Sequence, residues 1–419
     1  WYLMYHTIFF RRRHGTRESM MGPSRAGRNV RGRPVDGGDL AQRFERWRNG
    51  ERAWLITRWR SEFDAAIETR RGGTPDGAET PEARRERQLP KVLALIEQGE
   101  ISRGLRLLHS SGVAALTPGV IEQLRRKHPP RRTPMPAVFG LPVGRIEVHL
   151  EETFRGLRAK RGTGPTGRRN EYLSALTARF EEPRAATVME AYDGFAGAFL
   201  SSELPEWFYA VEAAARLVPL VKSPPSVPGG DPDVRPVAIG EVDVCAFTRA
   251  AYRDVTHSVL ADYLAPQQVA VGISGGLSIL VHGVRALLRM RRDFVVVRLD
   301  LRNAYNEIDR AVLLQRMAAV PELGPLARFF HTMHTAESAL YLGDRRRLFA
   351  GVDDRSGDSA SGVRQGSTES SSAFCVGIHP EMVTLDGALR DEGGGAWGDM
   401  DDIYAVGPAA HVFPAIEAF

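Results

Sequence analysis

Residues Val295 to Ile308 read VVVRLDLRNAYNEI, and this stretch decides the fold that we expect. The apolar, β-branched run from Phe294 to Leu299 has the length and composition of a buried strand. Asp300 then lies at the end of the strand, where a carboxylate leaves the core and faces a cleft. Because a carboxylate is costly to bury without a cation or hydrogen-bond partners, Asp300 is a candidate metal ligand. The alternative is an ordinary turn or cap residue, which a strand-end aspartate more often is.

Two more aspartates, Asp401 and Asp402, occupy a tight turn further along the chain. Glycines at 393–395 precede the turn, and an apolar run that begins at Ile403 follows it. The order of strand, acidic turn and strand predicts a hairpin that presents two carboxylates at its tip. Taken alone, such a hairpin is most often a solvated turn.

A third segment, residues 361–366, reads SGVRQG and precedes a Ser/Thr-rich helix start. In this order, the three segments resemble the reverse transcriptases, in particular the non-LTR (LINE-type) retrotransposon branch. The family's first palm motif, D-x-x-x-A-aromatic-[DN]-x-apolar, is matched by Asp300, Ala304, Tyr305, Asn306 and Ile308. The GxxQG motif is matched by Gly362, Gln365 and Gly366, and the core of the third motif by Met400, Asp401, Asp402 and Ile403.

A candidate phosphate-binding hairpin lies upstream, where Lys222 is followed by a turn rich in Gly and Pro and then by Arg235-Pro236. It looks like the family's fingers hairpin, whose lysine and arginine hold the triphosphate of the incoming nucleotide. An ammonium and a forked guanidinium suit anionic oxygens. Lys222 is the last of four lysines in a chain with 52 arginines, although a chance surface lysine is the alternative. The resemblance covers residues 205–407.

The resemblance implies an RNA-directed DNA polymerase, a nucleotidyltransferase that adds deoxynucleotides to a primer 3′-hydroxyl. Asp300, Asp401 and Asp402 would be its catalytic residues and would bind two Mg²⁺ ions, or Mn²⁺ in their place. Two such ions can stabilise both the entering and the leaving oxygen of the transfer, and Mg²⁺ prefers carboxylate oxygens. The implied partners are an RNA template, a DNA primer and a dNTP, while protein partners stay undefined.

Several residues would contact the nucleotide or the nucleic acid. Tyr305 stands where the family has an aromatic steric gate, whose ring clashes with a ribose 2′-hydroxyl. Gln365 and Gly366 would contact the incoming nucleotide, and Arg364 would add a phosphate contact. Viral RNA-dependent RNA polymerases share this palm but carry D-x4-D and Gly-Asp-Asp, so Tyr305 and Met400 make that activity a minor alternative.

Three features depart from the family pattern. Asp399 replaces an aromatic residue, and Ser367-Thr368 follows GxxQG where the family has Asp or Ser and then Pro. The chain also ends 17 residues after Asp402, so we expect a fragment without a thumb. The second hypothesis is therefore a degenerate retroelement relic that binds nucleic acid without catalysis.

Composition adds a basic arm. The formal charge is +5, and residues 11–90 carry 19 arginines against 12 acidic residues. We expect residues 1–81 to be a largely disordered arm with a short helix near 40–67, in which Arg11, Arg12 and Arg13 bind phosphate backbones. A solvated linker in an arginine-biased genome is the equal alternative. Two cysteines favour a reducing, intracellular compartment, nucleus or cytoplasm, and no apolar run is long enough for a membrane span.

The predicted fold class is α+β: a right-hand polymerase palm and fingers, with helices packed on an antiparallel sheet. A helical region and the basic arm precede it. The expected divisions are the arm at 1–81, a helical region with a Pro/Arg/Gly-rich linker at 82–204, a fingers-like region at 205–292 and the palm at 293–419. Apolar spacing predicts helices at 90–98, 101–108, 118–127, 172–180, 185–199, 206–221, 241–264, 310–320 and 325–334. Short strands are expected at 143–150, 339–342 and 347–350.

Overall fold

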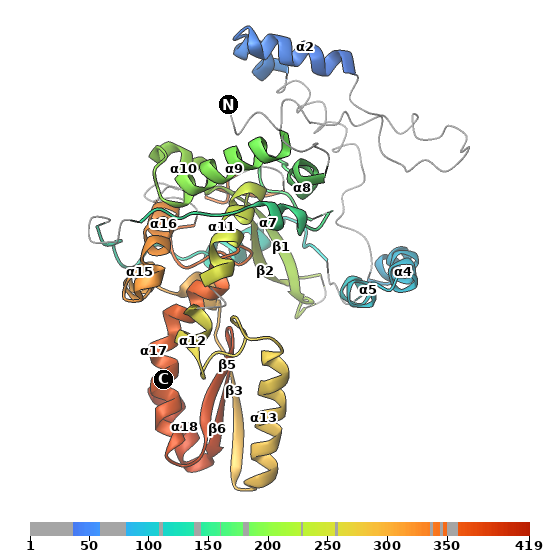
Figure 1. Ribbon diagram of the computed structural model, residues 1–419. Coiled ribbons are helices and arrows are strands. Elements are labelled where there is room, and N and C mark those ends of the chain that lie inside the picture. The colour runs from blue at the N-terminus through green and yellow to red at the C-terminus, as the bar shows by residue number, and fades with distance from the viewer. Residues whose placement is uncertain are drawn as a thin grey trace. The chain divides into compact units, whose positions relative to one another are not determined.

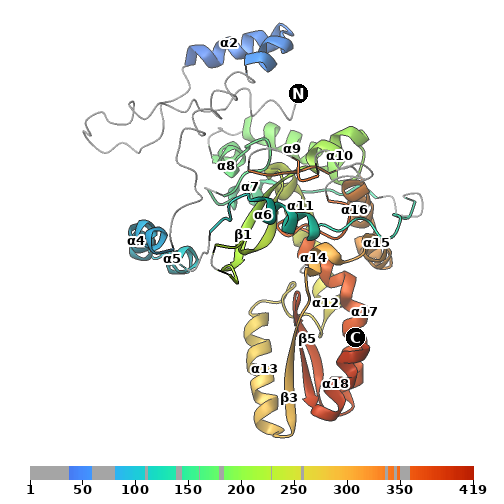
Figure 2. The same ribbon diagram turned by 180° about the vertical axis from the view of Figure 1, so that it is seen from behind.

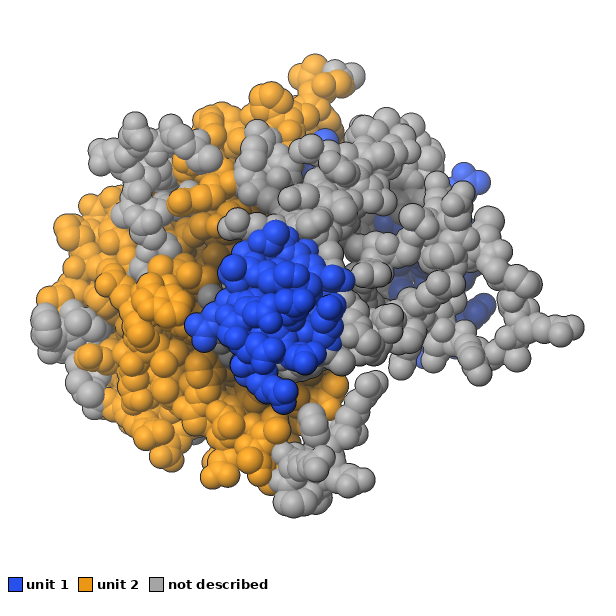
Figure 3. Space-filling view, turned by 90° about the horizontal axis from the view of Figure 1, so that it is seen from above, with its two compact units in different colours: residues 1–115, 166–168 blue, residues 116–165, 169–419 orange. Residues whose placement is uncertain are grey.

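The computed structural model describes residues 37–58, 81–108, 112–137, 144–159, 161–178, 184–227, 229–255, 259–335, 338–343, 347–349 and 359–419. The chain divides into two compact units, which Figure 3 distinguishes by colour. Unit 1 comprises residues 1–115 and 166–168, and unit 2 comprises residues 116–165 and 169–419. The expected fingers-like and palm regions both belong to unit 2. The predictions for Arg11, Arg12 and Arg13 lie outside the described residues.

The longer described segments of unit 1 are helical. They contain α2 (Gly37–Arg48), a short helix at 52–58, α4 (Pro81–Glu97) and α5 (Ile101–Leu108). The helix expected near 40–67 is interrupted at residues 49–51, and its residues 59–67 lie outside the described part of the chain. Gly104 allows α5 to pack closely on α4, because a Cβ at this position would lie 3.1 Å from Ile96 Cγ1 and 3.3 Å from the Val92 carbonyl oxygen.

Unit 2 combines helices with two small sheets, so the fold is mixed α+β. Its helices before the first sheet are α6 (Pro118–Arg126), α7 (Glu151–Arg155), α8 (Asn170–Ala178), α9 (Arg184–Leu200) and α10 (Glu206–Glu212). The Thr117 hydroxyl accepts a hydrogen bond from the Val120 amide, and Pro118 occupies the first turn of α6, as the sequence predicts. Among the described helices, none is both long and apolar enough to cross a membrane.

The first sheet has the strand order β2-β1-β4, formed by β1 (Ala215–Ser223), β2 (Asp233–Ile239) and β4 (Leu340–Tyr341). Strands β1 and β2 form the expected antiparallel hairpin, and β4 is parallel to β1. The prediction of a helix over 206–221 is wrong beyond residue 212. Pro219 disfavours a helix interior, and residues 215–219 alternate between buried and partly exposed, as a strand does.

Three further helices lead from this hairpin to the second sheet. They are α11 (Val242–Val255), α12 (Ala261–Leu264) and α13 (Gly276–Met290), so two helices stand where one was expected at 241–264. Residues 144–150 are not a strand, which corrects the prediction for 143–150. At 347–349 there is only an isolated bridge, between Arg347 and Tyr341.

The second sheet has the order β3-β6-β5 and is antiparallel. Its strands are β3 (Phe294–Asp300), β5 (Gly395–Asp399) and β6 (Asp402–Pro408). In Figures 1 and 2 it lies between α13 on one side and α17 (Ser370–Arg390) and α18 (Ala409–Ala418) on the other. The core under the sheet combines buried side chains of α17, the strands and α18: Met382, Leu385, Leu389, Ala396, Ile403, Ala405 and Val412.

Strand β3 is an edge strand of this sheet and most of its residues are partly or fully exposed, so the expectation of a buried strand is wrong. Only Phe294 is fully buried, and Val296 is 41 % exposed. After β3 come α14 (Ala304–Glu307), α15 (Arg310–Ala318), the 3₁₀ turn η4 (Pro321–Leu323) and α16 (Gly324–Thr335). Gly377 of α17 lets this segment pack closely, since a Cβ there would lie 2.4 Å from Ile308 Cδ1.

Candidate functional site

A pocket of about 480 Å³ lies in unit 2, where the two sheets and the loop before α17 meet. Its lining includes every residue that the sequence predicted to be catalytic or to bind the nucleotide: Lys222, Arg235, Asp300, Tyr305, Gln365, Gly366, Asp401 and Asp402. These residues come from segments up to 180 positions apart in the chain. Arg298, Ser367, Ser370 and Ser371 complete the lining.

The strand register explains why carboxylates gather on one wall of the pocket. Asp300 of β3 and Asp399 of β5 are each paired with Asp402 of β6, and directly opposed residues of antiparallel strands share a face of the sheet. Asp401 lies in the turn between β5 and β6. Burial raises the pKa of Asp399, and the charges of Asp402 and Asp401 raise it further. The wall therefore disfavours an additional negative charge and favours a cation.

Arg298 lies two residues before Asp300 on β3 and faces the same side of the sheet. Its Nη2 donates a hydrogen bond to Asp402 Oδ1 over 2.7 Å, and its Nε donates to the same oxygen over 3.2 Å. The pair is solvent-exposed, so its contribution to stability is small. Its electrostatic consequence is that Asp402 already has a cationic partner, whereas Asp300 and Asp401 have no such ion pair among the described residues.

The carboxylates are suitable ligands for Mg²⁺, although they are not a preassembled cage. Within the described part of the chain, no three His, Cys, Asp or Glu side chains are close enough to hold a metal ion together. Mg²⁺ commonly binds through one or two carboxylates, several waters and the phosphates of a substrate. Asp300 and Asp401 supply two such oxygen ligands in one pocket, so the residues fit a cation that arrives with a nucleotide.

The β1–β2 hairpin contributes two basic residues to the pocket lining, Lys222 and Arg235. Lys222 lies at an irregularity of the β1–β2 ladder, where the register shifts between Val221 and Ser223. A bulge of this kind re-aims a side chain, and Lys222 is exposed and lines the pocket. Arg235 is paired with Leu220 on the neighbouring strand and is also exposed. The hairpin therefore contributes an ammonium and a guanidinium to the same pocket as the carboxylates.

Tyr305 lies on α14 and lines the pocket. Its ring packs against Phe374 of α17 with a centroid distance of 5.0 Å, and its hydroxyl lies 3.4 Å from Ser371 Oγ. Burial raises the pKa of Tyr305 to about 12, an effect that the Ser371 hydrogen bond opposes and the charge of Asp401 reinforces. The side chain is therefore a neutral, fixed ring at neutral pH.

The loop that carries Gln365 is held by close backbone approaches, which explain both glycines of GxxQG. A Cβ on Gly362, which has φ +64°, would lie 2.3 Å from the Tyr305 carbonyl oxygen. A Cβ on Gly366, at φ +118°, would lie 2.5 Å from the Ala238 carbonyl oxygen of β2. The Gln365 carbonyl accepts a hydrogen bond from the Ala238 amide over 2.8 Å. The loop thus joins the segment around Tyr305 to the β1–β2 hairpin.

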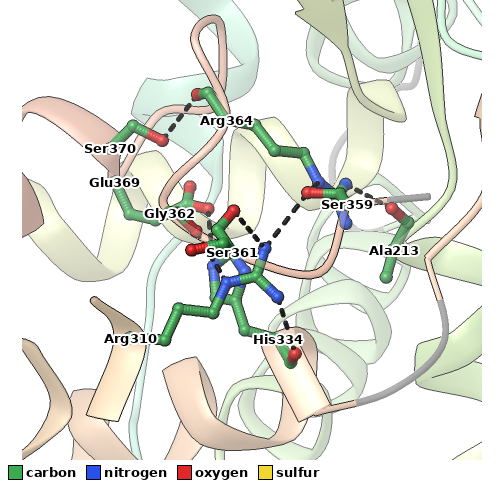
Figure 4. Close-up of polar contacts among 9 residues, drawn as sticks. All are labelled: Ala213, Arg310, His334, Ser359, Ser361, Gly362, Arg364, Glu369 and Ser370. Carbon is green, nitrogen blue, oxygen red and sulfur yellow. Dashed lines mark hydrogen bonds and ion pairs between the residues drawn. The ribbon is translucent and has the colours of Figure 1, made fainter. Parts of the chain in front are cut away.

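A buried arginine, Arg310, supports this loop from below (Figure 4). It is 2 % exposed, and its guanidinium donates to the carbonyl oxygens of Gly362 over 2.6 Å, His334 over 3.0 Å and Ser361 over 3.2 Å. A fourth bond reaches Ser359 Oγ over 3.1 Å. Desolvation lowers the pKa of Arg310, and the charges of Arg364 and Arg131 lower it further. Four oxygen acceptors in this position compensate for the burial of the cation.

Arg364 does not face the pocket, in contrast to the phosphate contact expected for it. It is 6 % exposed, and its guanidinium donates to the Ala213 carbonyl and, over 3.4 Å, to Ser359 Oγ (Figure 4). Burial lowers the pKa of Arg364 to about 10, against the opposing charge of Glu369. Its position within the GxxQG loop gave no sign of this orientation, because neighbouring loop residues point in different directions.

Sequence reasoning missed four residues that shape the site: Gln268, Arg298, Arg310 and Ser371. Of these, Arg298 had a usable signal, since a strand residue two positions before Asp300 must share its face. Comparison with protein families found none whose model matches the chain, and comparison with curated proteins found no match either.

Proposed function

We propose that this chain is an RNA-directed DNA polymerase of the non-LTR retrotransposon type. The single observation that carries the proposal is the lining of one pocket. It contains the carboxylates of Asp300, Asp401 and Asp402 together with the cationic side chains of Lys222 and Arg235. Carboxylates and cationic side chains in one pocket suit the binding of a triphosphate together with divalent cations.

In the proposed reaction, the 3′-oxygen of a primer attacks the α-phosphate of a deoxynucleotide and pyrophosphate leaves. Lys222 and Arg235 bind phosphate oxygens and orient the triphosphate. Asp300 and Asp401 would hold Mg²⁺, which supplies charge stabilisation for the entering and leaving oxygens. Arg298 balances the charge of Asp402, so that Asp402 supports the site without adding an uncompensated carboxylate.

Tyr305 and Gln365 give the proposed site its selectivity. The Tyr305 ring is fixed by Phe374 and Ser371, and we assign to it the exclusion of a ribose 2′-hydroxyl. The Gln365 side chain lines the pocket while its backbone is bonded to β2. Its amide is therefore available for the base or sugar of the nucleotide.

The test is Mg²⁺-dependent incorporation of dNTPs on a primed RNA template. The wild-type chain is compared with Asp401→Asn and with Asp391→Asn, a control at an exposed aspartate outside the pocket. We expect Asp401→Asn to reduce incorporation by at least ~100-fold, because loss of a metal-site group costs on this order, and Asp391→Asn to leave it unchanged. Equal activity in the wild type and Asp401→Asn would contradict the proposed site.

A second function, nucleic-acid binding without catalysis, is favoured by the Arg298–Asp402 ion pair and by the absence of a three-carboxylate cage among the described residues. In that case, the same assay shows no incorporation by any variant. Retention of the primed template in a gel-shift measurement then supports the binding function.

A further inference from the structure

We propose that Gln268 is a positioning residue, whose side-chain amide fixes the turn that carries Asp401 and thereby sets the affinity of the site for a divalent cation. The cation-binding part of this inference rests on the function proposed above. The part that concerns the turn depends only on contacts within the chain.

The first observation is a two-point contact between one side chain and the backbone of one residue. Gln268 Nε2 donates a hydrogen bond to the Met400 carbonyl oxygen over 2.9 Å, and Gln268 Oε1 accepts one from the Met400 amide over 3.1 Å. Gln268 is completely buried, with 0 % exposure. Both ends of the amide are thus used on Met400, the residue directly before Asp401.

The second observation is that Met400 needs such support. Its φ is +60°, in the left-handed region, where a side chain with a Cβ is disfavoured by about 1–2 kcal/mol. Glycine would relieve that cost, but this chain has methionine. The amide of Gln268 binds the backbone on both sides of the Met400 Cα, and so it opposes relaxation of the turn.

The third observation is that the neighbouring strand makes room for this side chain. A Cβ on Gly398 would lie 2.6 Å from Gln268 Nε2 and 3.0 Å from its Cδ. The backbone around Gln268 also pairs with β5. The Val269 amide donates to the Gly398 carbonyl over 3.0 Å, and the Gly398 amide donates to the Gln267 carbonyl over 2.6 Å. Gln268 is therefore built into the edge of the sheet as an additional, short strand segment.

Its sequence neighbour Gln267 provides a matched contrast. Gln267 is also buried, but its Nε2 donates to Asp386 Oδ2 of α17 over 2.7 Å. Asp386 in turn accepts a hydrogen bond from the Ala396 amide over 3.1 Å. Gln267 thus ties a helix to the sheet, whereas Gln268 contacts the turn next to Asp401.

The experiment measures two quantities on the full chain: Mn²⁺ affinity, from the electron paramagnetic resonance signal of the free ion, and hydrogen exchange of the Met400 amide at residue resolution. The variants are Gln268→Met, which keeps the volume and removes both hydrogen bonds, and Gln267→Met as the control. Thermal unfolding of each variant is recorded in parallel. A third variant, Gly398→Ala, keeps glutamine at 268 but displaces its side-chain amide. It replaces Gln268→Met in the experiment if that variant does not fold.

We expect Gln268→Met and Gly398→Ala to weaken Mn²⁺ binding by about 10-fold, the size typical for groups that orient metal ligands, and to accelerate exchange at Met400. Gln267→Met should lower the unfolding temperature and leave both quantities at their wild-type values. Wild-type Mn²⁺ affinity in Gln268→Met would overturn the inference. If the wild-type chain itself binds no Mn²⁺, the proposed metal site fails, and the exchange rate of Met400 alone decides whether Gln268 fixes the turn.

Discussion

Individual residues of the pocket differ in how strongly their surroundings fix them. Lys222 and Arg235 are exposed on a hairpin, whereas Tyr305 is held by a ring contact with Phe374 and by the Ser371 hydroxyl. A residue fixed in this way is suited to exclude a substrate atom, because exclusion requires a side chain that cannot move aside. A substitution at Tyr305 is therefore the direct test of the proposed selectivity for deoxynucleotides.

Replacing Tyr305 with alanine should admit ribonucleotides. With the ring removed, no side chain from this position meets a 2′-hydroxyl, so we expect the preference for dNTPs over rNTPs to fall by roughly 10–100-fold, the range that steric differences in a pocket supply. Single-nucleotide incorporation with each substrate measures this ratio. Tyr305→Phe keeps the ring and is the control; loss of selectivity in Tyr305→Phe as well would show that the hydroxyl, rather than the ring, discriminates.

The second prediction at this scale concerns Gly362. Alanine there combines a positive φ with a Cβ 2.3 Å from the Tyr305 carbonyl, so we expect the free energy of unfolding to fall by about 2–4 kcal/mol. Gly275→Ala is the control: it also has a positive φ, +71°, but nothing lies within 4 Å of its Cβ. That variant should lose only about 1 kcal/mol. Denaturant titration compares the two, and equal losses would mean that backbone conformation alone requires glycine at 362.

At the scale of elements, the site depends on a loop that has little regular structure of its own. Residues 359–366 are fixed by Arg310 from below, by the segment around Tyr305 on one side and by β2 on the other. The loop therefore has the rigidity of its neighbours, and removal of its buried support should release it.

Arg310→Met tests that support. The substitution removes four hydrogen bonds and leaves buried carbonyl oxygens without a donor, so we expect the free energy of unfolding to fall by about 3 kcal/mol. Arg302→Met, at an exposed arginine in the same part of the chain, should change it by less than about 0.5 kcal/mol. Denaturant titration of both variants provides the measurement. A loss below 1 kcal/mol for Arg310→Met would show that water replaces its hydrogen bonds.

Elements with a strong local signal were predictable from the sequence, and those that depend on distant partners were not. The α6 start at Thr117-Pro118 and the hairpin before Asp402 both follow from local capping and turn chemistry. Part of the strand at 215–223 was predicted to be helical, because its apolar residues fit both the helical and the strand periodicity. Only Pro219, which disfavours a helix interior, distinguishes the two. The contacts of Gln268 and Arg310 join positions far apart in the sequence, which no local pattern reveals.

At the scale of unit 2, we expect three buried or half-buried histidines to make stability depend on pH. Desolvation lowers the pKa of His331, His334 and His379 from the ordinary histidine value. Below pH 6.5 the unfolded chain then binds more protons than the folded one, so stability decreases as the pH falls. Burial raises the pKa of Glu369. Above the ordinary pKa of a glutamate, the folded chain then binds more protons than the unfolded one, so this group makes stability increase as the pH falls.

His379 isolates this effect, because burial is the cause of its lowered pKa and its ring packs on Tyr263 with a centroid distance of 4.6 Å. We expect the wild-type free energy of unfolding to decline between pH 7.5 and 5.5, and His379→Gln to decline less steeply, by at most about 1.4 kcal/mol per pH unit. Denaturant titrations at several pH values give the slopes. Identical slopes would assign the pH dependence to other groups.

Helix α17 contacts the pocket at one end and the β5 backbone near the other. Its first turn lines the pocket and bonds the GxxQG loop through Ser370, while Asp386, near its other end, bonds the β5 backbone. At 1.5 Å per residue, its 21 residues form a rod roughly 30 Å long. The helix therefore connects the pocket with the far end of the β3-β6-β5 sheet as one continuous element. Pro380 removes one backbone hydrogen bond partway along that helix and marks the point at which it bends most easily.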